Sequence, residues 1–537
     1  MTDQQTVHDV TFDLLRKLGL TTVFGNPGST EQTFLQNWPD DFEYVLALQE
    51  ASAVAMADAF SQATGKPALV NLHTAAGTGN GIGSLVAAYR ANTPLIITAG
   101  QQTREMSLID PYLNNPDATE MPKPWVKWSY EPARGEDVPA AFMQAYAMAM
   151  QAPKGPVFLS IPLDDWDKPA LGPAVVRQVS EKVAPDVQRL SAFAERISAA
   201  RTPMLVLGPE VDRAGGWDAG IAFAEKLRAP VYASALSDRV SFPETHPLYA
   251  GPLGLTIADV EQQIRGHDLV IVIGAPVFRY YPYVAGQYLP EGSELLHITS
   301  DPHVAGVAPV GDSLIGDVAV ALTQLTDMIR VPDDRQPPQP LVRTGRSEGP
   351  VQAPMSSNAL YETLSTVKPD DAAVVMESTS TLLDLFNWLP TTRTGSFYAT
   401  GSGGIGWGLP AAVGLALGDR ARGVHRPIVA TIGDGSFQYS IQALWTAAQH
   451  KLPIVFVVLR NGEYAILKSF AELEETPNVP GLNLPGLDIA SVARGFGCRA
   501  VDVDSTDMLA EQFKTSLDAD GPTVLVVPTI PQLPRLG

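Results

Sequence analysis

Two polar residues that follow neighbouring apolar runs could hold a metal ion. The run IVATIG ends at Asp434 in GDGS, and the next run, IVFVVLR, ends at Asn461 in NGEY. If both runs are parallel strands, their carboxyl ends share one edge of a sheet, so Asp434 and Asn461 lie side by side. A carboxylate, a carboxamide and a free backbone carbonyl are hard oxygen ligands that suit Mg²⁺, with phosphate oxygens and water completing the shell. The simpler interpretation is two turns stabilised by Asx side chains.

The segment 401–406, GSGGIG, fits the G-x-G-x-x-G fingerprint of dinucleotide sites. That fingerprint needs an acidic residue at the end of the next strand, about 20 residues on. The first candidate there is Asp434, which already has a metal-site interpretation. We therefore interpret the segment as a glycine-rich turn that allows close approach to the backbone, which a ligand can exploit.

Three residues in the first third of the chain stand where an apolar run gives way to a turn or helix. His73 follows ALVNL, Glu50 precedes an Ala-rich stretch, and Ser29 closes the turn FGNPGS. An imidazole and a carboxylate at the ligand-binding edge of a sheet can transfer protons. The structural alternatives are a packed histidine and a first-turn glutamate favoured by the helix dipole.

The elements that must position these residues are strands introduced by proline. Proline is tolerated at the first residue of a strand, and continuous apolar runs indicate strands covered on both faces. Within each third of the chain, the first two such prolines stand about 27 residues apart, which leaves room for one crossover helix. The pattern predicts three doubly wound α/β domains with parallel sheets. The introducing prolines are Pro67, Pro94, Pro156, Pro203, Pro230, Pro427, Pro453 and Pro522.

Composition bounds the class of protein. The 537 residues include 37 Lys plus Arg and 58 Asp plus Glu, a net charge of −21, which argues against a nucleic-acid partner. The single cysteine, Cys498, excludes an intrachain disulfide, and no apolar run approaches the roughly 18 residues of a membrane span. We expect a cytoplasmic protein with no membrane partner. The proline-rich stretch 331–356 and a weaker linker near 165–188 predict domains at 1–180, 181–340 and 341–537.

Taken together, these segments resemble the thiamine diphosphate enzymes, and among them the benzoylformate decarboxylases. The matching stretches span almost the whole chain in the family's order, and the longer ones are specific to the decarboxylases. They include TVFGNPGS (22–29), LALQEA (46–51), VKWSYEPA (126–133), GHDLVIVIGAPVFRY (266–280), ESTST (377–381), IGDGS (432–436) and SI-ALWTAAQ (440–449). The resemblance implies an N-terminal pyrimidine-binding domain, a central domain and a C-terminal diphosphate-binding domain.

The resemblance also implies roles for individual residues. Asp434, Asn461 and the Glu463 carbonyl would hold Mg²⁺, or Ca²⁺ in its place, and Glu50 would accept the proton of the cofactor's aminopyrimidine ring. Ile405 would be the bulky side chain that bends the cofactor. The remaining cofactor contacts would be Thr379, Ser380, Gly403, Gly435, Ser436, Gly462 and Tyr464. The substrate pocket would be formed by Ser29, His73, Leu113, Leu467 and Phe470.

The implied activity is decarboxylation of an aromatic or bulky 2-keto acid, such as benzoylformate, to an aldehyde and CO₂ through an enamine intermediate. In this family a second histidine follows GAPVFRY, where this chain has Tyr281. We place Tyr281 among the catalytic candidates with Glu50, His73 and Ser29, although a phenol titrates near 10 and exchanges protons less readily than imidazole near neutrality.

Three other functions stay open on the residues alone. A carboligase or lyase would use the same cofactor, a nicotinamide oxidoreductase would use the turn at 401–406, and a non-catalytic binding subunit would use neither. The family builds each site from two chains, so the resemblance implies a homodimer or homotetramer, because Glu50 and Asp434 lie in different domains yet serve one cofactor.

Overall fold

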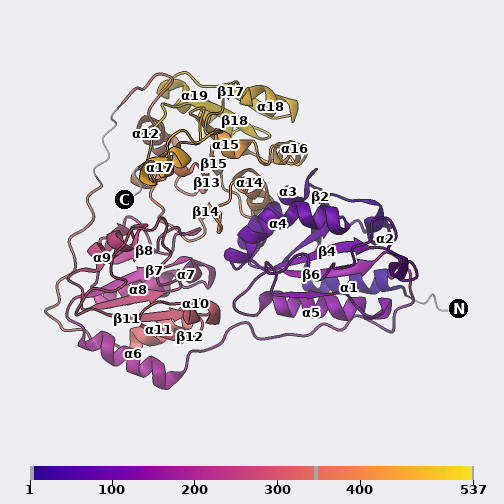
Figure 1. Cartoon of the computed structure of the whole chain (residues 1–537), viewed down its shortest axis with the longest axis horizontal. Helices are drawn as coiled ribbons and strands as arrows, with labels where there is room; N and C mark the ends of the chain where they lie inside the picture. The colour runs from indigo at the N-terminus through magenta and orange to yellow at the C-terminus, as the bar shows by residue number, and fades with distance from the viewer. Residues whose placement is uncertain (1–4, 344–348, 535–537) are drawn as a thin grey trace.

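The protein is built from three parallel β-sheets of six strands each, connected by helices (Figure 1). The computed structural model describes residues 5–343 and 349–534. Apolar clusters cover both faces of each sheet, so the predicted class of three doubly wound α/β domains is confirmed. Each predicted strand-introducing proline stands at or directly before a strand. Part of the predicted linker, 344–348, lies outside the described residues, and the boundaries at 180 and 340 stay predictions.

The N-terminal sheet has the strand order β2-β1-β3-β4-β6-β5, with every pair parallel. Its strands are β1 (Thr22–Gly25), β2 (Glu43–Leu46), β3 (Ala68–Leu72), β4 (Leu95–Gln101), β5 (Trp128–Tyr130) and β6 (Val157–Pro162). Its helices are α1 (Val7–Leu18), α2 (Gln32–Leu35), α3 (Glu50–Thr64), α4 (Thr74–Arg90) and α5 (Val138–Met150), with 3₁₀ turns η1 (Ser29–Glu31), η2 (Ser107–Ile109) and η3 (Gly135–Asp137).

The central sheet has the order β12-β11-β10-β7-β8-β9. Its strands are β7 (Pro203–Leu207), β8 (Val231–Ala233), β9 (Tyr249–Pro252), β10 (Leu269–Ile273), β11 (Glu294–Thr299) and β12 (Asp312–Ile315). Its helices are α6 (Val187–Ala199), α7 (Pro209–Arg213), α8 (Trp217–Leu227), α9 (Ile257–Ile264), α10 (Pro302–Gly306) and α11 (Val318–Met328).

The C-terminal sheet has the order β14-β13-β15-β16-β18-β17. Its strands are β13 (Ala373–Glu377), β14 (Phe397–Ala399), β15 (Ile428–Gly433), β16 (Ile454–Arg460), β17 (Arg499–Asp502) and β18 (Thr523–Pro528). Its helices are α12 (Ser357–Val367), α13 (Leu382–Trp388), α14 (Gly408–Ala421), α15 (Asp434–Phe437), α16 (Gln442–Gln449), α17 (Ala465–Leu473), α18 (Ile489–Gly495) and α19 (Thr506–Leu517), with the 3₁₀ turn η4 (Thr379–Thr381). Numbered within its own sheet, this order is the same as that of the N-terminal sheet, whereas the central sheet differs.

Helices α3 and α14 pack together and join the N- and C-terminal domains, as Figure 1 shows beside the label of α4. The backbones approach so closely that a Cβ atom added to Gly414 would lie 1.9 Å from the Met56 carbonyl oxygen. One apolar cluster runs across this contact and includes Met56, Trp407 and Leu415. The helix that begins at Glu50 is therefore held against the domain that carries Asp434.

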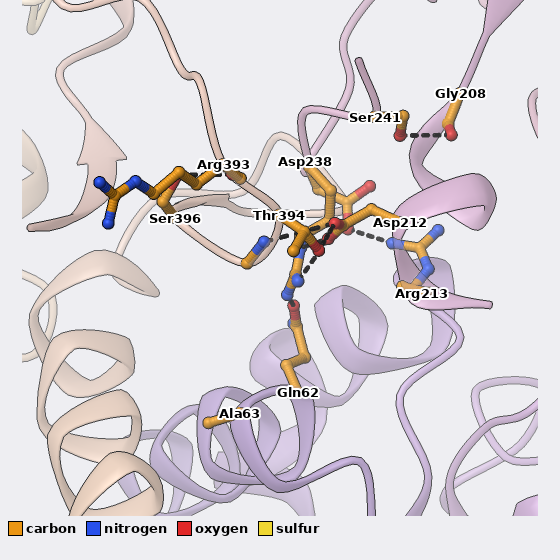
Figure 2. A network of polar contacts seen from close by, with 12 residues as sticks. Gln62, Ala63, Gly208, Asp212, Arg213, Asp238, Ser241, Arg393, Thr394 and Ser396 are labelled. Carbon is orange, nitrogen blue, oxygen red and sulfur yellow. Dashed lines mark hydrogen bonds and ion pairs between the residues drawn. The ribbon is translucent and has the colours of Figure 1, made fainter. Parts of the chain in front are cut away.

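The three domains also meet at one polar junction, drawn in Figure 2. Arg239 of the central domain pairs with Asp212 at 2.5 Å and donates to Gln62 of α3 at 3.2 Å. Its guanidinium also lies 4.1 Å from the ring centroid of Tyr398, in β14. Thr394, in the C-terminal domain, donates to the other oxygen of Asp212 at 2.5 Å. This mostly buried network of paired polar groups connects all three domains.

None of the helices within 5–343 and 349–534 is long and apolar enough to cross a membrane.

Candidate active site

The predicted metal-binding residues lie at the carboxyl ends of two adjacent parallel strands. Gly433 of β15 is in register with Leu459 of β16, so Asp434 and Asn461 follow neighbouring positions on the same sheet edge. Asp434 accepts hydrogen bonds from Gly435 N at 2.8 Å and from Gly462 N at 2.7 Å. The second bond connects the two loops directly.

The chemistry of this donor set fits Mg²⁺. Asp434 is 2% exposed, and burial raises the pKa of its carboxyl group, a cost that a bound cation would offset. The Glu463 side chain pairs with Lys468, which leaves the Glu463 backbone carbonyl as the available donor. Among the described residues no three His, Cys, Asp or Glu side chains converge, so the shell would rest on one carboxylate with amide, carbonyl and diphosphate oxygens.

The predicted diphosphate-binding residues surround the same edge. Thr379 and Ser380 form the η4 turn directly after β13, which pairs with β15. Gly435 lies beneath the Tyr464 ring, because a Cβ atom there would come within 2.4 Å of that ring. The glycine therefore allows Tyr464 to cover the start of α15. Gly403 and Ile405 belong to the turn between β14 and α14, where Gly403 is exposed and Ile405 is half-buried.

Glu50 is the first residue of α3 and is held by two amides. The Asn26 side chain donates to Glu50 Oε1 at 3.1 Å, and the Asn80 side chain donates to Oε2 at 3.0 Å. Glu50 is 7% exposed, so the two bonds fix the orientation of a buried carboxylate. The sequence analysis assigned no role to either asparagine, although Asn26 stands in the segment 22–29 that carries the resemblance.

His73 is the residue before α4, and its ring is fixed by a buried carboxylate that sequence reasoning missed. Glu31 Oε2 lies 2.9 Å from His73 Nδ1, and Glu31 is 1% exposed. The backbone amides of Gly28 and Gly100 also donate to Glu31, so it is held as an acceptor. This arrangement places the proton on Nδ1 and leaves Nε2 as the nitrogen able to exchange a proton with a substrate.

Ser29 and Gly28 belong to the same corner of the N-terminal domain. Ser29 begins η1 and is exposed. A Cβ atom added to Gly28 would lie 2.1 Å from His73 Nδ1, so only glycine lets the imidazole approach the η1 turn this closely. The fold therefore brings Ser29, His73 and the missed Glu31 together.

Tyr281 and Phe470 form a second group of predicted site residues. Their rings lie 4.8 Å apart at an interplanar angle of 45°, and Tyr281 is 57% exposed. Phe470 and the 45%-exposed Leu467 both belong to α17, so this contact joins the central domain to the predicted pocket wall. Leu113 is half-buried in the loop after η2. Among the described residues, no hydrogen bond or ion pair connects Glu50 or His73 to the Asp434 and Asn461 loops.

The fold defines a class of protein: three doubly wound α/β domains with parallel six-stranded sheets, the architecture of the thiamine pyrophosphate enzymes. The chain belongs to the thiamine pyrophosphate enzyme family. Its residues 5–121 match the N-terminal TPP binding domain, 190–325 the central domain and 379–527 the C-terminal TPP binding domain. Its cofactors are thiamine diphosphate and Mg²⁺.

Similarity extends over the whole chain. Benzoylformate decarboxylase of Pseudomonas aeruginosa is 45% identical over 532 residues, which cover 98% of this chain and 99% of the relative. The crystal structure of benzoylformate decarboxylase from Polynucleobacter necessarius has a TM-score of 0.97 at 51% identity, covering 99% and 100%. A structure from Mycobacterium smegmatis, assigned to the thiamin diphosphate-dependent enzymes, has a TM-score of 0.95 at 77% identity, covering 98% and 100%.

The chain is accordingly a thiamine diphosphate-dependent decarboxylase of 2-keto acids, a carboxy-lyase. The cofactor, when bound, supplies an electron sink for the pair left behind as CO₂ departs. This activity excludes two of the functions that the residues alone left open, a nicotinamide oxidoreductase and a non-catalytic binding subunit.

Proposed function

We propose that the substrate is an aromatic or bulky 2-keto acid of the benzoylformate type, converted to the aldehyde and CO₂. The observation that carries this proposal is the contact between Tyr281 and Phe470, 4.8 Å between ring centroids. The exposed Tyr281 ring, stacked on the half-buried Phe470 beside Leu467, offers flat apolar surface for an aryl side chain. Two relatives of 45% and 51% identity are benzoylformate decarboxylases, which supports the same substrate class.

The proposed roles follow the geometry. Asp434, Asn461 and the Glu463 carbonyl hold Mg²⁺, and Glu50 holds the proton of the aminopyrimidine ring. His73, with Nδ1 bound to Glu31, exchanges a proton with the substrate through Nε2. Ser29 lies beside it at the same sheet edge and positions the substrate. Tyr281 contributes an aromatic wall rather than the family's second imidazole, because its phenol is a weak acid near neutrality.

Product identification across a panel of 2-keto acids tests this function. The purified enzyme with thiamine diphosphate and Mg²⁺ is given benzoylformate, a branched aliphatic 2-keto acid and pyruvate, and the aldehydes and CO₂ are quantified. We expect benzoylformate to give benzaldehyde and CO₂ in equal amounts, with kcat/KM at least tenfold above that for pyruvate. A preference for pyruvate would refute the aromatic substrate.

Carbon–carbon bond formation is a second candidate function with the same cofactor. It is favoured by Tyr281, because a poor proton donor in place of the second histidine slows the protonation that precedes aldehyde release. Adding acetaldehyde to the benzoylformate assay separates the two functions. If added acetaldehyde does not lower the amount of benzaldehyde released, the result supports the decarboxylase. If a 2-hydroxy ketone forms in place of benzaldehyde, the result supports the carboligase.

We also propose that a homodimer, or a homotetramer made of two dimers, completes each site. Glu50 is bonded only within its own domain among the described residues, which supports a second chain as the source of the opposing half. Large apolar side chains are exposed near the site in one chain, including Leu108 at 93% and Tyr112 at 88%, as expected of a surface that a copy covers. The buried, free Cys498 supports the proposed cytoplasmic location.

A further inference from the structure

Glu377 is a buried carboxyl group without a cationic partner among the described residues. It is the last residue of β13 and is 1% exposed, and its Oε2 atom lies beside Gly408, the first residue of α14. Burial raises its pKa to about 7. Burying an acid without a cationic partner is costly, so a residue of this kind indicates a specific task.

The other carboxyl oxygen of Glu377 holds the end of the glycine-rich turn. Oε1 accepts hydrogen bonds from Gly406 N at 3.1 Å and from Trp407 N at 2.9 Å. These amides stand directly before α14, where a negative charge also interacts favourably with the helix dipole. The turn follows β14, so the acceptor that fixes it comes from the neighbouring strand, β13.

The turn needs such an anchor because two of its glycines have left-handed backbone conformations and its tip is bonded only by the nearby Ser402 side chain. Gly403 has φ of +75° and Gly406 has φ of +103°, conformations that other residues rarely adopt. The tip at Gly403 and Gly404 is exposed, whereas Gly406 and Trp407 are buried. Ile405 stands between the exposed tip and the end held by Glu377, so its position depends on the hydrogen bonds that Glu377 accepts.

Two further bonds hold the anchored end. Ser440 donates to the Gly406 carbonyl oxygen at 2.7 Å. The Trp407 indole donates to Asp58 at 2.8 Å, and Asp58 belongs to α3, the helix that begins at Glu50. The turn is thus connected both to its own sheet and to the helix of the neighbouring domain.

We propose that Glu377 is a positioning residue: it fixes the turn at 401–406 so that Ile405 stands where the cofactor binds. The proposal rests on the proposed role of Ile405 and adds the residue that holds it in place. Above its pKa of about 7 Glu377 is ionised, and hydrogen bonds to an ionised acceptor are stronger than those to a neutral one, so the carboxylate then holds the amides better than an amide side chain would.

Glu377→Gln tests the proposal, with Glu244→Gln as a matched control. Glu244 is also buried, at 3% exposure, also has a pKa raised to about 7, and accepts from Thr391 N at 2.6 Å, away from the turn. In Glu377→Gln an amide NH₂ group replaces Oε2. Oε2 lies 3.2 Å from a Cβ atom built on Gly408. The new NH₂ group is a hydrogen-bond donor and would therefore face backbone amides that are donors too.

Isothermal titration of the cofactor-free protein with thiamine diphosphate in excess Mg²⁺ gives the main readout, beside Tm and the kinetics of 2-keto acid turnover. We expect Glu377→Gln to weaken cofactor binding at least tenfold and to lower kcat, with KM for the 2-keto acid within twofold of wild type. Its Tm should fall no further than that of Glu244→Gln. Cofactor binding within twofold of wild type, or an equal loss in Glu244→Gln, would overturn the proposal.

Two more variants keep the outcome interpretable. If Glu377→Gln does not fold, Glu377→Asp replaces it, because the shorter side chain keeps the charge but withdraws it from the amides; unfolding of both would make Glu377 a general stability residue and overturn the proposal. Ile405→Ala tests the proposed function separately. If Ile405→Ala loses kcat while Glu377→Gln resembles wild type, the role of Ile405 stands and only the anchor fails.

Discussion

At the scale of single residues, we propose that the site separates into groups that bind the cofactor and groups that move protons. Asp434 belongs to the first set, and Glu50 and His73 to the second. Each side chain is held by hydrogen-bond partners that can act in one direction only. Backbone amides donate to Asp434, two asparagine amides donate to Glu50, and the Glu31 carboxylate accepts from His73. Substitutions that change donor to acceptor therefore test each role.

Asp434→Ala is expected to weaken binding of thiamine diphosphate and Mg²⁺ by at least 10²-fold, because a hard ligand and its charge leave the metal site. Equilibrium dialysis measures it. Asp488→Ala is the control, since Asp488 caps α18 in the same domain by accepting from Ser491 N at 3.0 Å. Wild-type affinity in Asp434→Ala would remove this residue from the metal site.

Glu50→Gln is expected to fold and bind cofactor but to lose most activity, because an amide cannot take the proton of the pyrimidine ring. It also places a donor opposite Asn26 or Asn80, whose side chains both donate to this carboxylate. Quenched NMR of C2 hydrogen–deuterium exchange in the bound cofactor measures the loss. Exchange as fast as in wild type would show that Glu50 does not assist this step.

His73→Ala is expected to lower kcat by about 10²–10⁴-fold, the usual contribution of a positioned acid–base group. Tyr281→Phe should lose less, because it keeps the ring that contacts Phe470 and removes only a weak acid. Steady-state kinetics with benzoylformate compares them. A larger loss in Tyr281→Phe would mean that the phenol replaces the missing imidazole.

At the scale of elements, parallel strands and the α3–α14 contact place these residues. Eight of the eighteen strands described could be predicted because proline before a continuous apolar run is a local signal, and the predicted ligand positions were taken from strand ends. The partners could not: Glu31 and His73 are 42 residues apart, and nothing local to Glu31 marks it as the group that holds an imidazole. The strand order of the central sheet likewise depends on long-range pairing and has no local signal.

The close approach of α3 and α14 gives a stability prediction. Gly414→Ala is expected to destabilise the protein by about 3 kcal/mol, because the new methyl group would overlap the Met56 carbonyl oxygen and force the helices apart. Gly83→Ala in α4 is the control: it meets open space and should gain about 0.5–1 kcal/mol from helix propensity. Urea denaturation measures both. Equal stability in the two variants would contradict the close packing.

At the scale of the whole molecule, the proposed shared site requires that Glu50 of one copy and Asp434 of another serve the same cofactor. Within one chain both residues are held by partners in their own domains, and the exposed apolar side chains near the site are left for another copy to cover. A single chain then has two half-sites, and a twofold dimer has two complete ones.

Co-expression of Glu50→Gln and Asp434→Ala chains carrying different affinity tags tests this claim most directly. In a doubly tagged hybrid dimer, one site carries both substitutions and the other carries neither, so we predict activity of up to about half that of wild type. Each variant purified alone should be nearly inactive. Hybrids no more active than their parents would contradict the shared site, because an intrachain site always keeps one of the two substitutions.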